Sequence, residues 1–134
     1  MSKSNTTEND ILAYLFNATA FSYNAATNLQ VHLHVGDPGE TGTTATNPAT
    51  YTSYAPVTVA RSGSGWTVSG NQASNAALIQ FPQCTGGTNT ITHVSITPSG
   101  SSQILYSGAL NSSLAVSNLV QPQFAIGALT ITED

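Results

Sequence analysis

Charged side chains are scarce in this chain of 134 residues, where they make up 6% of the sequence. Ordinary soluble domains carry roughly 25%. Between Thr41 and Thr132 the only charged side chain is that of Arg61. A soluble monomer normally relies on surface charge to stay dispersed, whereas an uncharged polar surface can lie against another protein without burying unpaired ions. The scarcity therefore favours a subunit of a larger assembly.

Positive charge is scarcer still, because Lys3 and Arg61 are the only basic side chains and the formal net charge is −4. The chain has no basic patch that could neutralise a phosphate backbone or dock on an anionic membrane surface. No apolar run approaches the roughly 20 residues of a membrane span. The opening residues MSKSNTTEND lack the apolar core of a signal peptide. We therefore expect no nucleic-acid partner, no membrane and synthesis in the cytoplasm.

Groups suited to acid–base catalysis are also few. The aspartates are Asp10, Asp37 and Asp134, and paired-carboxylate hydrolysis requires two acidic groups in one cleft. The sequence contains neither a Gly-x-Ser-x-Gly elbow nor a phosphate-binding loop. Cys84 is the only cysteine, so it cannot form an intrachain disulfide, and we interpret it as a small semi-apolar residue at a strand end. We expect no enzymatic activity, no catalytic residue and no cofactor.

A histidine pattern is the one feature that suggests a metal. His32 and His34 lie two residues apart, so a strand would place both on one face, and His93 could add a further ligand. Glu40 follows beyond a Gly-Asp-Pro-Gly turn, a wider spacing than the similar motif of cupins. The simpler interpretation is that these histidines occupy the polar face of an alternating strand. We favour the second interpretation and expect no metal.

One helix is predicted near the N-terminus. Asn5 and Glu8 have the spacing of a capping box. An apolar stripe follows at helical spacing and consists of Ile11, Leu12, Leu15 and Phe16. We expect the stripe to be buried, in the first interpretation against the chain's own sheet. In the alternative, the helix is an arm that packs on a neighbouring subunit.

The remainder of the chain has the pattern of short β-strands. The segment LQVHLHV alternates apolar and polar residues with period two. Further candidates, separated by Gly, Ser, Asn and Pro turns, are APVTVA, WTV, AALIQF, TITHVSI, QILYSG, SLAV, QFAI and ALTIT. We predict an all-β fold, a jelly-roll-type β-sandwich of about eight short strands with one N-terminal α-helix. The single domain would comprise a helix and exit segment at 1–28 and the sandwich at 29–134.

Arg61 and the aromatic residues are the candidates for contacts. Arg61 could be an intrachain anchor on backbone carbonyls or the C-terminal carboxylates, or an intersubunit contact, since arginine is enriched in interface hot spots. Trp66 is predicted to fill the core. Exposed aromatic rings could alternatively stack on sugars, which would involve Tyr51, Tyr54 and Trp66. The candidate interface residues are Arg61, Tyr51, Tyr54, Leu15 and Phe16.

The order of several segments resembles a family of small phage virion proteins along nearly the whole chain. After the N-terminal helix these segments are VHLHVGDPGETG, SYAPVTVARSGSGW, SNAALIQFP, ITHVSI, ILYSGAL and FAIGALTITED. Members are often labelled tail-fibre-like, and some act as capsid cement or decoration proteins. Family members commonly read Tyr-Ala-Arg where this chain has Tyr54, Ala55 and Pro56, so no role is carried over to Arg61. The resemblance implies a β-sandwich of the virion.

These observations lead us to expect a structural protein of the phage virion, assembled in the host cytoplasm. The preferred role is capsid cement, with the major capsid protein and copies of the chain itself as partners. A dimer is the first expectation for the oligomer and a trimer the second. The alternative is a tail or tail-fibre component, and the alternative of another class is a glycan-binding module.

Overall fold

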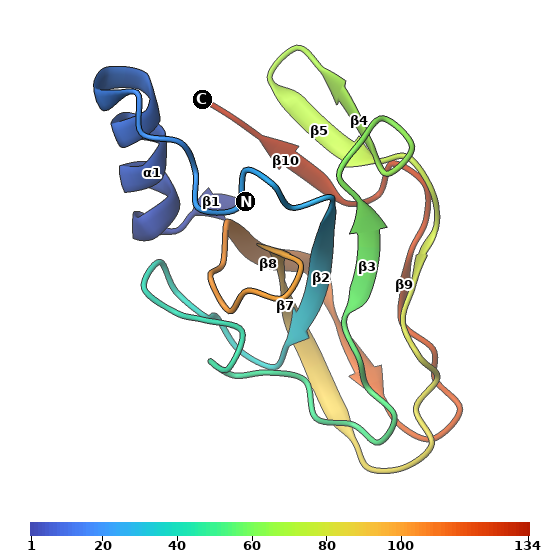
Figure 1. Cartoon of the computed structure of the whole chain (residues 1–134). Coiled ribbons are helices and arrows are strands. Elements are labelled where there is room, and N and C mark those ends of the chain that lie inside the picture. Colours follow the sequence, from blue (N-terminus) through green and yellow to red (C-terminus); the bar gives the residue numbers. More distant parts are fainter.

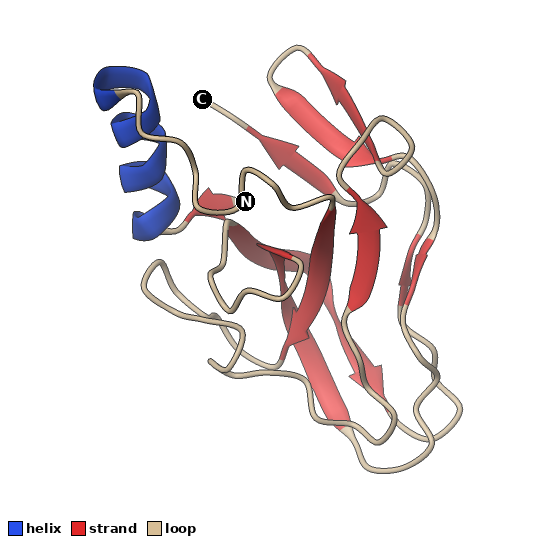
Figure 2. Ribbon diagram, in the orientation of Figure 1, coloured by secondary structure: helices blue, strands red, loops and turns tan.

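The computed structural model describes residues 1–134, which form one helix and ten strands. The helix α1 spans Asn5–Asn17. The strands are β1 (Ser2–Lys3), β2 (Asn28–His34), β3 (Val57–Ala60), β4 (Trp66–Ser69), β5 (Gln72–Asn75), β6 (Ile79–Gln80), β7 (Asn89–Pro98), β8 (Tyr106–Val116), β9 (Gln123–Phe124) and β10 (Thr130–Thr132). The all-β class with one N-terminal helix is confirmed (Figure 2).

The strands form three antiparallel sheets. The largest has the order β1-β8-β7-β2-β3, and the others have the orders β10-β5-β4 and β6-β9. The two small sheets are linked through Asn75 at the end of β5, which bonds through its backbone to Leu129 and Gly127 in the segment between β9 and β10. In Figure 1 the β6–β9 pair runs along the right-hand side, beyond β3. Together the small sheets supply the layer opposite the five-stranded sheet.

Most predicted strands form, with three differences. The short strand β1 before the helix was not predicted, and it pairs with β8. The segments QILYSG and SLAV belong to one long strand, β8, whose register against β7 is interrupted between Ile91 and His93. Strand β5 was not predicted, because its sequence QASN is polar and follows turn residues. It is a strand because it pairs with β4 on one side and β10 on the other. Strand formation depends on such neighbours more than on intrinsic propensity.

The core lies between the layers and is built from alternate residues of the strands. Val31 and Leu33 of β2 belong to the core, as does Ile79 of β6. Phe81, which directly follows β6, belongs to it as well. Trp66 belongs to the same cluster and is 8% exposed, which confirms its prediction as a core residue. Cys84 is also buried there as a free thiol.

The polar face of β2 is covered as well. His34 is fully buried although it alternates with the apolar residues of β2. The long irregular loop 35–50 pairs with the end of β2, where Pro48 forms an isolated antiparallel bridge with His34. The carbonyl oxygen of Thr46 in this loop also lies 2.9 Å from the His34 ring, so the loop is part of the fold and helps to bury this side chain.

Helix α1 begins one residue earlier than the capping-box pattern predicts. Its N-cap is Ser4, whose side-chain oxygen accepts a hydrogen bond from the backbone N–H of Thr7 at 3.2 Å. The predicted pairing of Asn5 with Glu8 is replaced by this cap. The helix ends at Asn17 and is followed by the C-cap Ala18, which adopts a left-handed conformation with a φ of 53°. No helix in the structure is long and apolar enough to cross a membrane.

Candidate assembly interface

Three of the four side chains in the predicted apolar stripe of α1 point into solvent, and the fourth, Ile11, is half-buried. Leu12, Leu15 and Phe16 are 57%, 65% and 79% exposed, and we refer to them as the α1 stripe. No strand packs extensively against α1, which stands to one side of the sheets in Figure 1. The expectation that the stripe docks on the chain's own sheet is therefore wrong. The sheets pack mainly on each other, and none of them lies against the stripe.

The N-terminal half of α1 is fixed to the loop before β8. The hydroxyl of Ser4 donates to the carbonyl of Ile104 at 2.6 Å, and the backbone N–H of Ser4 donates to the carbonyl of Leu105 at 3.2 Å. One turn later, the side-chain amide of Gln103 donates to Asp10 at 3.0 Å. These polar contacts replace the apolar packing that usually holds a surface helix, so the stripe is not needed to hold α1 on its own chain.

The C-terminal half of α1 is fixed by an aromatic series. Tyr14 stacks on Phe21 with ring centroids 5.1 Å apart, and Phe21 stacks on Tyr23 at 5.2 Å. The guanidinium of Arg61 lies 5.9 Å from the centre of the Tyr23 ring. Stacked aromatic pairs and cation–π contacts of this kind contribute roughly 0.5–1.5 kcal/mol each. Both ends of the helix are thus tied to the body of the protein.

Arg61 anchors the segment that leaves α1. Its Nη1 atom donates to the carbonyl oxygens of Tyr23, Asn24 and Ala26 at 3.0–3.2 Å. Of the roles considered from the sequence, the structure therefore shows the intrachain anchor on backbone carbonyls. Through Tyr23 this anchor also supports the aromatic series, so Arg61 helps to set the position of the α1 stripe.

The two tyrosines predicted as interface residues lie inside the protein. Tyr51 is 3% exposed and its hydroxyl donates to the carbonyl of Pro82 at 2.8 Å. Tyr54 is half-buried, and its hydroxyl oxygen accepts from the backbone N–H of Leu33 at 2.9 Å. Burial raises the pKa of Tyr51 to about 12. As Trp66 is buried too, these three rings do not form an exposed platform for a sugar.

The histidines form a hydrogen-bonded interior cluster. The two ring nitrogens of His34 lie 2.9 Å from the carbonyl of Thr46 and 2.7 Å from the hydroxyl of Ser95. His32 contacts the hydroxyl of Thr97 at 3.2 Å. Burial, with a smaller effect from His34, lowers the pKa of His32 to about 4, and burial also lowers the pKa of His34. These contacts occupy both ring nitrogens of His34 and the Nε2 atom of His32.

The remaining predicted ligands do not complete a metal site. His93 faces His34 across the β2–β7 pairing, but its Nδ1 bonds to the hydroxyl of Thr92. The carboxylate of Glu40 lies beside the hydroxyl of Ser2 at the N-terminus. No group of three or more His, Cys, Asp or Glu side chains is arranged to hold a metal ion.

Glu133 joins the two ends of the chain. Its carboxylate forms a salt bridge with Lys3 of β1 and accepts a hydrogen bond from the hydroxyl of Tyr106. The hydrogen bonds from Lys3 and then Tyr106 lower the pKa of the Glu133 carboxyl, while burial is the main cause of the raised pKa of Tyr106. The terminal charges are therefore partly used within the chain.

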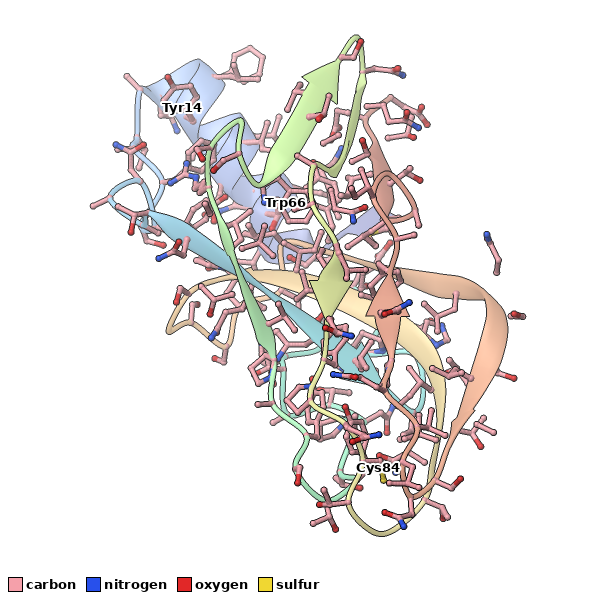
Figure 3. All side chains as sticks on the ribbon, turned by 90° about the vertical axis from the view of Figure 1, so that its right-hand side faces the viewer. Tyr14, Trp66 and Cys84 are labelled. Carbon is pink, nitrogen blue, oxygen red and sulfur yellow. The ribbon has the colours of Figure 1, made fainter.

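The structure also contains an apolar groove that the sequence did not predict. It lies between the β10-β5-β4 sheet and the five-stranded sheet and has a volume of about 410 Å³. Trp66 and Ile96 form part of its walls, and Val68, 74% exposed, lies at its rim. The indole N–H of Trp66 is buried without a hydrogen-bond partner. We call this feature the β4–β5 groove; Figure 3 labels Trp66 at the base of that hairpin.

The comparisons with known proteins give one result. Residues 2–132 match a family model described as "Podophage GP4 fiber I protein gp80". No curated protein matches the chain significantly. The match covers all the elements described above, including α1 and its stripe.

Proposed function

The chain belongs to the podophage GP4 fiber I protein gp80 family, a family of structural proteins of the phage virion, and from this premise we propose that it is a multi-copy subunit attached through α1. The observation that carries the proposal is the exposure of Leu12, Leu15 and Phe16 on a helix that is fixed at both ends. Apolar side chains held in this way are typical of protein–protein contacts.

The stripe can supply enough binding energy for such a role. Burying one large apolar side chain contributes about 1.5–3 kcal/mol, so three partly exposed ones offer several kcal/mol before the cost of association. That is weak for an isolated pair of proteins. In an array of many copies, each subunit makes several contacts at once and the weak contacts reinforce one another. The uncharged surface from Thr41 to Thr132, interrupted only by Arg61, adds neutral hydrogen bonds without burying ions.

We propose a fibre component as the first location, because the family description names a fibre protein. Capsid cement that binds the major capsid protein is the second candidate. It is favoured by the compact body of the chain, in which short strands pack in layers and no long helix or repeated segment extends away (Figures 1 and 2). In both roles the chain acts by binding, and we expect no catalytic activity.

Phage carrying Phe16→Asp test the attachment. A charge at Phe16, the most exposed residue of the stripe, should strongly reduce the amount of the protein in purified virions, while the melting temperature of the isolated protein stays within about 2 °C of wild type. Ile126→Asp is the matched control, since Ile126 is 71% exposed outside the helix and should incorporate normally. Normal incorporation of the Phe16→Asp protein would contradict attachment through α1.

The location and the chemistry of the contact are tested on wild-type virions. Hundreds of copies per particle, found on heads after separation from tails, would support cement, whereas a small number found on tails would support the fibre. In either location we expect the protein to remain bound in about 1 M sodium chloride, where the Debye length is near 3 Å. Release by moderate salt would contradict a contact made mainly by uncharged groups.

A further inference from the structure

We propose that the α1 stripe of one copy inserts into the β4–β5 groove of a neighbouring copy. The inference rests on the proposed role as a multi-copy subunit and names the partner of the stripe as a second copy of the same chain. The stripe and the groove are different surfaces of the molecule, so the contact is head-to-tail. Such a contact builds rings or open rows of subunits.

The groove matches the stripe in chemistry. Its walls are mainly apolar and include side chains from both layers, namely Leu29, Trp66, Ala73, Ile96, Leu105 and Ile131. The only charged residue at its edge is Glu133, whose carboxylate is paired with Lys3. The stripe likewise consists of Leu12, Leu15 and Phe16 without a charge among them. Joining the two surfaces would therefore remove apolar area from water without stranding an ion.

The two surfaces also match in size. A cavity of about 150 Å³ is enough to hold a benzene ring, so a groove of about 410 Å³ can accept two or three large side chains. Phe16 and Leu12 lie four residues apart and Leu15 three residues from Leu12, so one face of the helix carries all three. A helix laid across an apolar groove and anchored by residues at this spacing is a recurring mode of recognition.

Polar groups at the edges are complementary as well. The last turn of α1 contains no basic side chain, and the final carbonyls of a helix carry partial negative charge. Gln72 lies exposed at the groove, where its amide can donate to those carbonyls. The end of the stripe helix thus supplies the acceptors, and the groove supplies the donor.

The helix cannot use the groove of its own chain. Ser4 and Asp10 hold its first half to the loop before β8, and Tyr14 holds its second half through Phe21. With both halves fixed, the stripe remains exposed to solvent. The occupant of the groove is therefore a second molecule, and the stripe is the large apolar feature that every neighbouring copy brings with it.

The areas favour insertion over pairing of two stripes. The exposed parts of the three side chains amount to on the order of 300 Å². Either contact, stripe against stripe or stripe in groove, would bury roughly twice that in total, below the 1,200 Å² or more of a stable interface. Pairing of stripes leaves each copy with one such contact, whereas the head-to-tail arrangement gives each copy two, one with its stripe and one with its groove. Each single contact is weak, so we expect association only at high protein concentration.

Mixing two variants tests the arrangement. Phe16→Asp disables the stripe and Val68→Asp places a charge at the rim of the groove. Wild type should form oligomers beyond dimers in sedimentation measurements at high concentration, and each variant alone should stay monomeric. An equimolar mixture should give heterodimers and nothing larger, because one intact stripe meets one intact groove. Dimers of the Val68→Asp protein alone would overturn the proposal, since they would require stripe–stripe pairing.

Cysteine trapping provides a second measurement if a charged variant folds poorly. An equimolar mixture of Phe16→Cys and Val68→Cys proteins should form a disulfide-linked heterodimer at least tenfold faster than a mixture of Phe16→Cys and Ile126→Cys. Equal rates would overturn the proposal. Wild type that stays monomeric at every concentration would also overturn it, whereas the virion assay of Phe16→Asp would still test attachment to another protein.

Discussion

The end of β2 and the second half of α1 show opposite patterns: polar side chains are buried in the first and apolar side chains are exposed in the second. His34, the last residue of β2, is completely buried, as are Ser95 and Thr97 on the neighbouring strand β7. On α1, Leu15 and Phe16 are mostly exposed. The polar residues are inside because each finds a hydrogen-bond partner there. The apolar residues are outside because no apolar surface of the same chain faces the helix.

The difference indicates what each region is for. A buried and fully bonded polar cluster fixes one packing of the strands, and it gains nothing from a partner. An exposed apolar stripe contributes favourable free energy only when another molecule covers it and removes it from water. The first region therefore contributes to folding, whereas the second is the surface that we propose for assembly.

Two phenylalanine truncations give the largest contrast between the regions. Phe81 is 0% exposed in the core, and Phe81→Ala should reduce the free energy of unfolding by about 3–5 kcal/mol. Phe16 is 79% exposed, and Phe16→Ala should change it by less than about 0.5 kcal/mol. Denaturant titrations of the isolated protein measure both values. A large loss from Phe16→Ala would show that the helix packs on the body after all.

Asn75 extends the test to buried polar groups. Its side-chain amide donates to the carbonyls of Ala77 and Ala125, and its side-chain oxygen accepts from the backbone N–H of Leu129. Asn75→Ala would leave these buried groups without partners, so we expect a loss of about 2–3 kcal/mol. Asn118→Ala, at an exposed position, is the control and should have almost no effect. Equal effects would mean that water replaces the lost bonds.

Much of the fold was predictable from local pattern. The helix, the alternation of β2 and the core position of Trp66 follow from periodicity and residue type. Strand β5 did not, because QASN becomes a strand only between its two neighbours. The burial of His34 also depends on a distant element, the loop 35–50. Sequence pattern shows which residues share a face but not what covers that face.

The candidate interface was predictable only in part, because the sequence pattern does not show which faces are covered. The apolar spacing of Leu15 and Phe16 was visible in the sequence, but whether the chain's own sheet covers them was not. Tyr51 and Tyr54 are aromatic residues in a loop-like segment, yet their hydroxyls bond within the core. The β4–β5 groove forms between segments far apart in the chain, so no local signal marks it.

Arg61 should show an intermediate effect, confined to the region around α1. Arg61→Ala removes the donor to three carbonyls of the exit segment, and at this exposed position we expect a cost of about 1 kcal/mol. Amide hydrogen exchange should accelerate between residues 18 and 27 and in the last turn of α1, while the β2–β7 pairing stays protected. Uniform acceleration across the chain would contradict a local anchoring role.

The last prediction is a pH dependence that comes from the histidine cluster and is confined to acid conditions. The pKa of His32 is lowered from 6.5 to about 4, mainly by burial, so below pH 6.5 the unfolded chain takes up a proton that the folded chain does not. Stability from this group is therefore complete above pH 6.5 and is lost as the pH falls towards 4. His32→Gln should reduce, without abolishing, the change in melting temperature with pH across this window, because burial lowers the pKa of His34 as well. The Glu133 carboxyl, whose pKa is lowered from 4.5, contributes a loss only below that pH, so Glu133→Gln should leave the window unchanged.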